Sequence, residues 1–260
     1  MDTSIHATAT VDAHAELEPD VVVGAGAVIG EDVRIGTGTR VGPLAVILGP
    51  TRIGRDNTIH AHACLGDAPQ DLAYRGEPTR LEIGDGNHFR EFVTVHRGST
   101  KDEGVTRIGD DNLLMAYSHV GHDCRVGSGI TMANCATLAG HVSVGDHANI
   151  AGLSAIHQFA RVGCHAMLGG GTIAVMDIPP YTMASGNHAR LYGLNRRGLR
   201  RAGMAEAVIT ALRRAYRLLF RSGLGRAEAI AEVRRQGWDR TPEVAHLLGF
   251  LESSRRGVTR

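Results

Sequence analysis

The 260-residue sequence is poor in aromatic residues and has no long apolar run. Aromatic side chains make up only 4% of the chain, although an ordinary core of this size takes much of its volume from Phe, Tyr and Trp. The opening segment, MDTSIHATATVD, contains acids and lacks the apolar stretch of a signal peptide or membrane span. We therefore expect a cytoplasmic protein whose narrow interior is built from small aliphatic residues.

Several motifs of common protein classes are also missing. The cysteines form no C-x-x-C pair, which excludes a disulfide framework and favours reduced, buried thiols at Cys64, Cys124, Cys135 and Cys164. No Gly-x-Ser-x-Gly elbow and no Walker A motif occurs, which argues against a serine hydrolase or a P-loop nucleotidase. The function must come from another pattern.

Charge is nearly balanced overall but unevenly distributed. The net charge is +1, yet residues 190–260 contain 16 Arg against 6 acids, a balance of +10 that leaves −9 for residues 1–189. A tail this basic favours an acidic partner or ligand, although a solvated helix face would have the same composition.

A six-residue repeat organises most of the chain, and 34 glycines accompany it. Apolar residues recur at every sixth position from Ile5 to Leu65 and again from Ile83 to Val95, and a second frame runs from Ile108 to Leu168. Glycine often follows the repeated residue because it reaches turn conformations that a Cβ forbids. Each hexad is thus one short strand and one tight turn.

Hexads cannot bury an apolar side chain alone, so they must stack, and parallel stacking satisfies their backbone groups. The pattern predicts an all-β solenoid, a parallel β-helix. Its unbroken series leaves no room for a helix after Gly24-Ala25-Gly26, which resembles a dinucleotide fingerprint only superficially. The repeat is similar to that of hexapeptide-repeat acyltransferases, which implies a left-handed β-helix with about 18 residues per coil, against the usual crossover hand.

Two segments, 66–80 and 98–107, interrupt the repeat, and long loops on a rigid solenoid often carry the functional site. Pro179-Pro180 ends the repeat. Beyond about Asn195, apolar residues recur at helical spacing, and Thr241-Pro242-Glu243 is typical of a second helix start. We therefore predict two domains, a β-helix over residues 1–190 and a C-terminal α-helical domain over residues 191–260.

Fourteen histidines are the clearest chemical signal. With an 18-residue coil, His122, Gly140 and Gln158 share one column, and the next column contains Asp123, His141 and Phe159. A neutral imidazole beside a carboxylate can remove a proton from a sugar hydroxyl, which then attacks a thioester. The N–H of Gly140 could hold the oxyanion. The candidate catalytic residues are therefore His122, Asp123 and Gly140.

A metal centre and a cysteine nucleophile are the main rivals. The trimeric β-helix carbonic anhydrases bind zinc through a His-x4-His pair, but no two histidines here are five apart, so we expect no metal. Cys124 lies at a small-residue position of a hexad, where a buried structural thiol is expected.

Several longer strings resemble successive signature blocks of the UDP-N-acetylglucosamine acyltransferase family: GDAPQDLAYRGEPTRLEIGDGN, VTVHRGST, DNLLMAYSHVGHDCRVG, ATLAGHVSVGD, AIHQFARVG and IPPYTMASGNHARLYGLN. The resemblance covers nearly the whole chain. It implies transfer of a 3-hydroxyacyl chain from acyl carrier protein to the 3-hydroxyl of UDP-N-acetylglucosamine, which begins lipid A synthesis, by a homotrimer. No cofactor is implied, because phosphopantetheine is part of the donor.

The resemblance also implies residue roles. His122 is the general base, and Asp123 orients it. Contacts to the sugar, the diphosphate or the pantetheine arm are implied for Asp71, His96, His119, His141, His157 and Gln158, and nucleotide contacts for Asn195 and Arg201. The chain departs from the family at Ala73, Arg197 and Ala202, where a lysine, an acid and an arginine are common.

Acyl-chain length is assigned to a different column, which contains Asn134, Gly152 and Gly170. In the resembling family the residue at the position of Gly170 stops the acyl chain, so glycine implies a long chain, with Met167 beside it. A turn glycine kept for its backbone angles is the alternative explanation.

Three other functions share this fold. The N-acyltransferase acting later in lipid A synthesis carries an amino-terminal uridine-binding domain, and serine acetyltransferases carry helices before the β-helix, whereas the hexads here begin at Ile5. A non-enzymatic solenoid predicts flat rows of Thr rather than converging histidines. The residues alone leave open whether the acceptor bears a hydroxyl or an amine.

Overall fold

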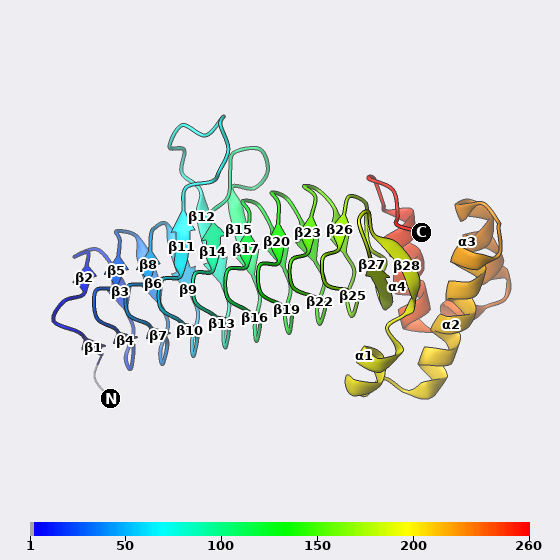
Figure 1. Ribbon diagram of the computed structural model, residues 1–260, viewed down its shortest axis with the longest axis horizontal. Helices are drawn as coiled ribbons and strands as arrows, with labels where there is room; N and C mark the ends of the chain where they lie inside the picture. The colour runs from blue at the N-terminus through cyan, green and yellow to red at the C-terminus, as the bar shows by residue number, and fades with distance from the viewer. Residues whose placement is uncertain (1–2) are drawn as a thin grey trace.

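The computed structural model describes residues 3–260. Residues 1 and 2, which begin the predicted first domain, lie outside the described part. A long, slender stack of coils occupies most of the chain, and the helices gather at its C-terminal end (Figure 1). The all-β solenoid predicted from the hexads and the helical C-terminal region predicted from the helical spacing are both confirmed.

Short strands form three sheets that run the length of the stack. Sheet A contains β1 (Ser4–Ile5), β4 (Val22–Val23), β7 (Arg40–Val41), β10 (Thr58–Ile59), β13 (His88–Phe89), β16 (Leu113–Leu114), β19 (Thr131–Met132), β22 (Asn149–Ile150), β25 (Met167–Leu168), β27 (Thr182–Ser185) and β28 (Arg190–Leu194). Sheet B contains β2 (Thr10–Val11), β5 (Val28–Ile29), β8 (Val46–Ile47), β11 (Cys64–Asp67), β14 (Thr94–His96), β17 (His119–Val120), β20 (Thr137–Leu138), β23 (Ala155–Ile156) and β26 (Ile173–Ala174). Sheet C contains β3 (Glu16–Leu17), β6 (Val33–Ile35), β9 (Thr51–Ile53), β12 (Arg80–Ile83), β15 (Val105–Ile108), β18 (Arg125–Val126), β21 (Ser143–Val144) and β24 (Arg161–Val162).

The strands pair in parallel with the coil above and the coil below, and the register follows the repeat. Val22 pairs with Arg40, and His119 pairs with Thr137, in each case one coil of 18 residues further along the chain. The repeated apolar residue points inward, as the full burial of Leu138 illustrates. Ile5 remains 48% exposed because β1 pairs only with β4.

Three corners join the sheets, and they differ. We call them the A/B, B/C and C/A corners after the sheets they connect. Both predicted interruptions lie at the B/C corner, where residues 68–79 separate β11 from β12 and residues 97–104 separate β14 from β15. Figure 1 shows both loops rising from the same edge of the stack. Arg97 anchors them by donating to the carbonyls of Gly49 and Gly66 and to the Tyr74 hydroxyl.

The C/A corner contains a ladder of buried asparagines that the sequence analysis did not identify. The Asn57 Oδ1 accepts from the backbone and side-chain amides of Asn87, and the Asn87 Oδ1 accepts from the same two groups of Asn112. The Asn112 Oδ1 accepts from the N–H of Ile130. Each side chain therefore supplies the polar partner that the next buried turn requires.

The C-terminal region begins with the antiparallel pair β27 and β28, followed by α1 (Arg196–Arg201), α2 (Glu206–Arg221), α3 (Arg226–Arg235), the short 3₁₀ helix η1 (Trp238–Arg240) and α4 (Pro242–Glu252). The predicted helical spacing is confirmed in α2, and Pro242 occupies the first turn of α4. A second apolar core holds the helices together. None of the helices in residues 3–260 is both long and apolar enough to cross a bilayer.

Arg161 ties this region to the β-helix. Its guanidinium bonds Asp177 and the carbonyl of Phe250, and it lies 4.3 Å from the centre of the Phe250 ring. The chain end returns to the same place, because the Thr259 N–H donates to the Asp177 carbonyl. The helices therefore dock on the last coil rather than trailing from it.

Candidate active site

The predicted histidine columns form at the B/C corner, in the coils that follow the two loops along the stack. His122 and Asp123 lie in the turn between β17 and β18. The His141 N–H donates to the His122 carbonyl, and the Phe159 N–H donates to the Gly140 carbonyl, so three successive coils are in register. The 18-residue columns predicted from the resemblance are confirmed.

His122 and Asp123 form a hydrogen-bonded pair. The His122 Nδ1 lies 2.7 Å from the Asp123 Oδ2. With the proton on Nδ1, where the carboxylate accepts it, the His122 Nε2 is left as a proton acceptor. The His122 side chain is 16% exposed and that of Asp123 only 1%, so the imidazole faces the surface and the carboxylate lies behind it.

Ser99, from the second loop, holds the buried carboxylate in place. The Ser99 N–H and hydroxyl donate to Asp123, and the Asp123 N–H in turn donates to the Thr106 hydroxyl. Burial alone would raise the pKa of Asp123, but the bonds from His122 and Ser99 outweigh it and lower that pKa. Asp123 is therefore a permanent carboxylate near neutral pH, oriented to stabilise a protonated His122.

Gly140 lies against the imidazole of His122. A Cβ on Gly140 would come within 2.6 Å of the His122 Cε1, so only glycine fits without displacing the ring. Among the described residues, no group accepts a hydrogen bond from the Gly140 N–H. The Gly140 N–H is thus a free donor beside the proton-accepting Nε2 of His122, where it could stabilise an oxyanion.

Two more histidines lie on β14 and β17, next to the pair. The His119 Nδ1 is 2.8 Å from the Thr94 hydroxyl, and the His96 and His119 rings meet edge to face at 5.1 Å. Burial and the nearby His96 and His122 lower the pKa of His119 to about 4, and burial also lowers that of His96. The His96 Nδ1 is buried without a partner in the described structure. Both rings are neutral at pH 7 and can bind polar substrate groups.

The remaining predicted contacts at this corner have different degrees of exposure. His141 stacks on Phe159 at 4.4 Å, its side chain is only 7% exposed, and burial lowers its pKa. His157 and Gln158 are exposed at the next coil, where they can meet a ligand. In the first loop, the Asp71 carboxylate accepts from the Ala73 N–H and forms an ion pair with Lys101 at 2.7 Å.

Three supporting residues were missed from the sequence: Ser99, Lys101 and Thr106. Ser99 lies within the string VTVHRGST, but nothing in a six-residue period shows that a loop residue bonds a carboxylate 24 positions later. The position of Ser99 inside the 98–107 interruption of the repeat was the only available signal.

The other predicted residues lie elsewhere on the chain. Asn195, Arg201 and Met167 line a hollow of about 360 Å³ at the C/A corner and the adjoining face of sheet A. The Asn195 side chain accepts from the Gly198 N–H and donates to the His165 carbonyl, so it caps α1 and anchors it to the β-helix. Within one chain, these residues are not brought together with His122.

Gly170 lies at the A/B corner in column with Gly152 and Asn134, as predicted. Its backbone does not adopt a positive φ, unlike that of its neighbour Gly171 at +68°. A Cβ on Gly170 would meet only the Gly152 carbonyl oxygen, at 3.6 Å. The alternative explanation, that Gly170 is kept for its backbone angles, is therefore wrong.

Two further features concern ligands. His122, Asp123 and His141 place one potential metal-ligand atom each within 4.8 Å of one another, but the Asp123 oxygens already bond Ser99 and His122, so a metal ion would have to displace those bonds. Cys124 is fully buried, and burial raises the pKa of its thiol to about 12. The arrangement favours a hydrogen-bonded base over a metal centre or a thiolate.

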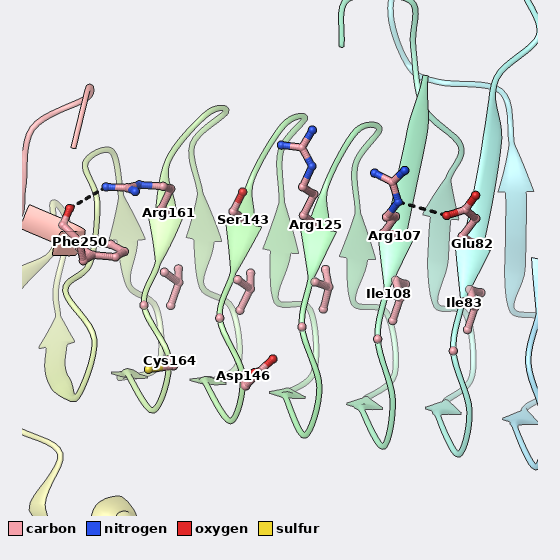
Figure 2. Close-up of a pocket in the computed structure, with 18 of the residues that line it drawn as sticks. Glu82, Ile83, Arg107, Ile108, Arg125, Ser143, Asp146, Arg161, Cys164 and Phe250 are labelled. Atoms are coloured by element: carbon pink, nitrogen blue, oxygen red, sulfur yellow. Dashed lines mark hydrogen bonds and ion pairs between the residues drawn. The ribbon is translucent and has the colours of Figure 1, made fainter. Parts of the chain in front are cut away.

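A hollow of about 820 Å³ lies away from the histidines, along sheet C. Figure 2 shows it as an open trough with Arg107, Arg125 and Arg161 along one side and Phe250 at its end. The glycines at the adjoining C/A turns lack side chains to fill it. The chemistry of His122 and Asp123 is a better guide to the active site than the size of this trough.

The comparisons with known proteins agree with this geometry. A family model described as UDP N-acetylglucosamine O-acyltransferase, domain 2, matches residues 177–259, and the hexapeptide repeat of bacterial transferases matches residues 32–67 and 106–140. The acyl-[acyl-carrier-protein]–UDP-N-acetylglucosamine O-acyltransferase of Burkholderia orbicola is 47% identical over 99% of this chain and 100% of its own length.

Solved structures show the same likeness. The UDP-N-acetylglucosamine O-acyltransferase of Moraxella catarrhalis superposes with a TM-score of 0.95 at 42% identity, covering 98% of this chain and 99% of that one. The corresponding enzyme of Francisella novicida gives a TM-score of 0.95 at 35% identity, covering 98% and 94%. The left-handed form of the β-helix, expected from the resemblance, is confirmed with them.

Proposed function

Since the chain belongs to the UDP-N-acetylglucosamine O-acyltransferase family, we propose that it transfers a 3-hydroxyacyl chain from acyl carrier protein to the 3-hydroxyl of UDP-N-acetylglucosamine, the first step of lipid A synthesis. The observation that carries the chemistry is the pair His122–Asp123, with its 2.7 Å bond and an imidazole facing the surface.

In this reaction the His122 Nε2 accepts the proton of the sugar hydroxyl as its oxygen attacks the thioester carbonyl carbon. Negative charge develops on the carbonyl oxygen, where the Gly140 N–H can donate to it. When the C–S bond breaks, the imidazolium returns the proton to the departing pantetheine sulfur. Asp123 holds the imidazole in the required tautomer and stabilises its charged form throughout.

We further propose a homotrimer with its sites between subunits. The support is the division of the predicted site, because His122 lies at the B/C corner whereas Asn195 and Arg201 lie at the C/A corner. Sheet C, with its open trough, separates these corners, so a neighbouring copy packed at this face would complete each site. Sedimentation should give three chains per active particle, and an active monomer would contradict the assembly.

The basic C-terminal region is proposed to attract the acidic carrier protein. In α2, Arg213, Arg214 and Arg217 have no acidic partner among the described ion pairs. Electrostatic attraction of this kind mainly accelerates encounter. Salt should therefore raise the KM for the acyl carrier protein, and a KM independent of salt would favour a merely solvated helix face.

The decisive assay offers purified protein a 3-hydroxyacyl carrier protein with UDP-N-acetylglucosamine or with its 3-amino analogue. Ester formation with the first sugar supports the proposal, and amide formation with the second alone would make the chain an N-acyltransferase. We expect activity after treatment with a chelator, since no metal or cofactor enters the mechanism. A cytoplasmic location remains the expectation from the sequence.

A further inference from the structure

Lys101, the single lysine of the chain, lies in the loop 97–104, next to the active site. All other basic residues except the histidines are arginines. Its ammonium crosses from one B/C loop to the other and lies 2.7 Å from the Asp71 carboxylate. The Lys101 side chain is 54% exposed and that of Asp71 only 11%, so the cation faces outward and the anion lies behind it.

Both partners of this ion pair are fixed to the body of the site. The Asp71 carboxylate also accepts from the Ala73 N–H at 2.9 Å, and Lys101 lowers the pKa of Asp71. On the other side, the Lys101 N–H donates to the Ser99 hydroxyl, and Ser99 bonds Asp123. The position of the ammonium is therefore linked to the same carboxylate that orients His122.

The other cations of the two loops are engaged elsewhere. The Arg75 guanidinium donates to the carbonyls of Leu72 and Tyr74, and that of Arg97 donates to the carbonyls of Gly49 and Gly66 and to the Tyr74 hydroxyl. Within residues 68–79 and 97–104, Lys101 is thus the basic residue whose charged group contacts only a carboxylate, that of Asp71. An ammonium has three donors, so it can keep Asp71 and still bind an anion.

We propose that Lys101 is a substrate-contacting residue that binds a phosphate group at the mouth of the site, with Asp71 as the residue that positions its ammonium. The proposal rests on the proposed function, because both substrates of that reaction carry phosphate. The group is either the diphosphate of the UDP-sugar or the phosphodiester of the donor's phosphopantetheine. Lysine can bind phosphate without the bidentate hydrogen bonds that arginine makes, since its ammonium acts as a point charge.

Kinetics identify which phosphate is bound. Lys101→Met should raise the KM for one of the two substrates about 10- to 100-fold, the range for one charge-assisted hydrogen bond, and change kcat far less. Lys101→Arg should recover part of that loss. In Lys101→Met, the additional change Ala73→Lys places an ammonium beside the same carboxylate and should also recover part of it.

The single lysine allows a second test that does not depend on turnover. An amine-specific acylating reagent can modify only Lys101 and the terminal α-amino group, which serves as an internal reference. UDP-N-acetylglucosamine, UDP and 4′-phosphopantetheine are the probes, and mass spectrometry of the peptides gives the labelling rates. Either the two UDP probes or the pantetheine probe should slow labelling of Lys101 several-fold without slowing that of the reference.

The outcomes are distinct. If wild-type protein makes the ester but no probe protects Lys101 and Lys101→Met leaves both KM values unchanged, the proposal is overturned while the proposed function stands. Alternatively, Lys101→Met could lower kcat equally whichever substrate is varied and lower the melting temperature, while no probe protects Lys101 from labelling. That result would show that Lys101 only joins the two loops, which also overturns the proposal. If wild-type protein makes no ester, the proposed function itself fails.

Discussion

The B/C and C/A corners have the same turn geometry but different roles. Each places a histidine or aspartate at a positive φ in successive coils, Asp123 and His141 at the first corner and His147 and His165 at the second. At the C/A corner the Asp146 carboxylate accepts from the Ser128 N–H and has no histidine partner. At the B/C corner the carboxylate bonds His122, and two loops enclose it.

The comparison shows that residue type alone does not make a catalytic site. Histidines and aspartates recur at both corners, but only where chain insertions cover the carboxylate does it become buried and bonded to an imidazole. The C/A corner instead contains the asparagine ladder, whose hydrogen bonds are all internal. One corner holds the coils together, and the other exposes reactive groups.

The strongest test of this difference is His122→Ala. Removing the base should lower kcat by about two to four decades, the usual contribution of general base catalysis, with the circular dichroism spectrum unchanged. His62→Ala is the matched control, because His62 stacks on Phe92 at the A/B corner, away from the site, and should retain full activity. A folded His122→Ala protein with wild-type turnover would remove His122 from the mechanism.

Gly170→Met extends the comparison to the third corner. Its Cβ fits without strain, so a longer side chain should shorten the space for the acyl chain that the resemblance places at Gly170, rather than unfold the protein. Excluding four methylene groups, each contributing about 0.8 kcal/mol, should cost roughly two decades in specificity for the long donor. Chain-length profiles should show a preference about four carbons shorter. Uniform loss on every donor would contradict a role for Gly170 in chain length.

Asn87→Ala tests the structural corner. It leaves the Asn112 backbone N–H and the Gly109 carbonyl without the partners that the Asn87 side chain provides, in a fully buried ladder. Unsatisfied buried groups of this kind should lower the free energy of unfolding by about 2–4 kcal/mol. Denaturant titration measures that loss, and kcat at low temperature should stay within about a factor of two because the B/C corner is untouched. Selective loss of kcat without loss of stability would contradict the division of roles.

The smallest effect concerns pH. The folded pKa of His119, about 4, lies below its unfolded value of 6.5, so its neutral form stabilises the fold. That contribution is fully present above pH 6.5 and is lost as pH falls from 6.5 to 4, and it amounts to at most about 3 kcal/mol. His119→Gln should flatten the fall in melting temperature over this window. Part of the fall in melting temperature should remain in this variant, because burial also lowers the pKa of His96. An unchanged slope would contradict burial of a neutral His119.

Much of the fold follows directly from the sequence. A period of six with an apolar residue in every strand permits one solution, a stack of coils, and the inward residues that it predicts, such as Leu138 and Val120, are fully buried. The helices of the tail were also predictable, because α2 has a clear apolar stripe. The buried asparagines were not, since Asn57, Asn87 and Asn112 follow no spacing that distinguishes them from surface turn residues.

For the site, the sequence by itself determined the adjacent pair His122–Asp123, and the 18-residue coil that the resemblance implies then placed this pair in column with Gly140. Only the tertiary structure decided what surrounds them. The bonds from Ser99 to Asp123 and from Lys101 to Asp71 join residues 24 and 30 positions apart through loops that do not obey the repeat. A periodic pattern predicts the positions of the residues within its repeat, whereas a loop conformation depends on contacts that form only when the chain has folded.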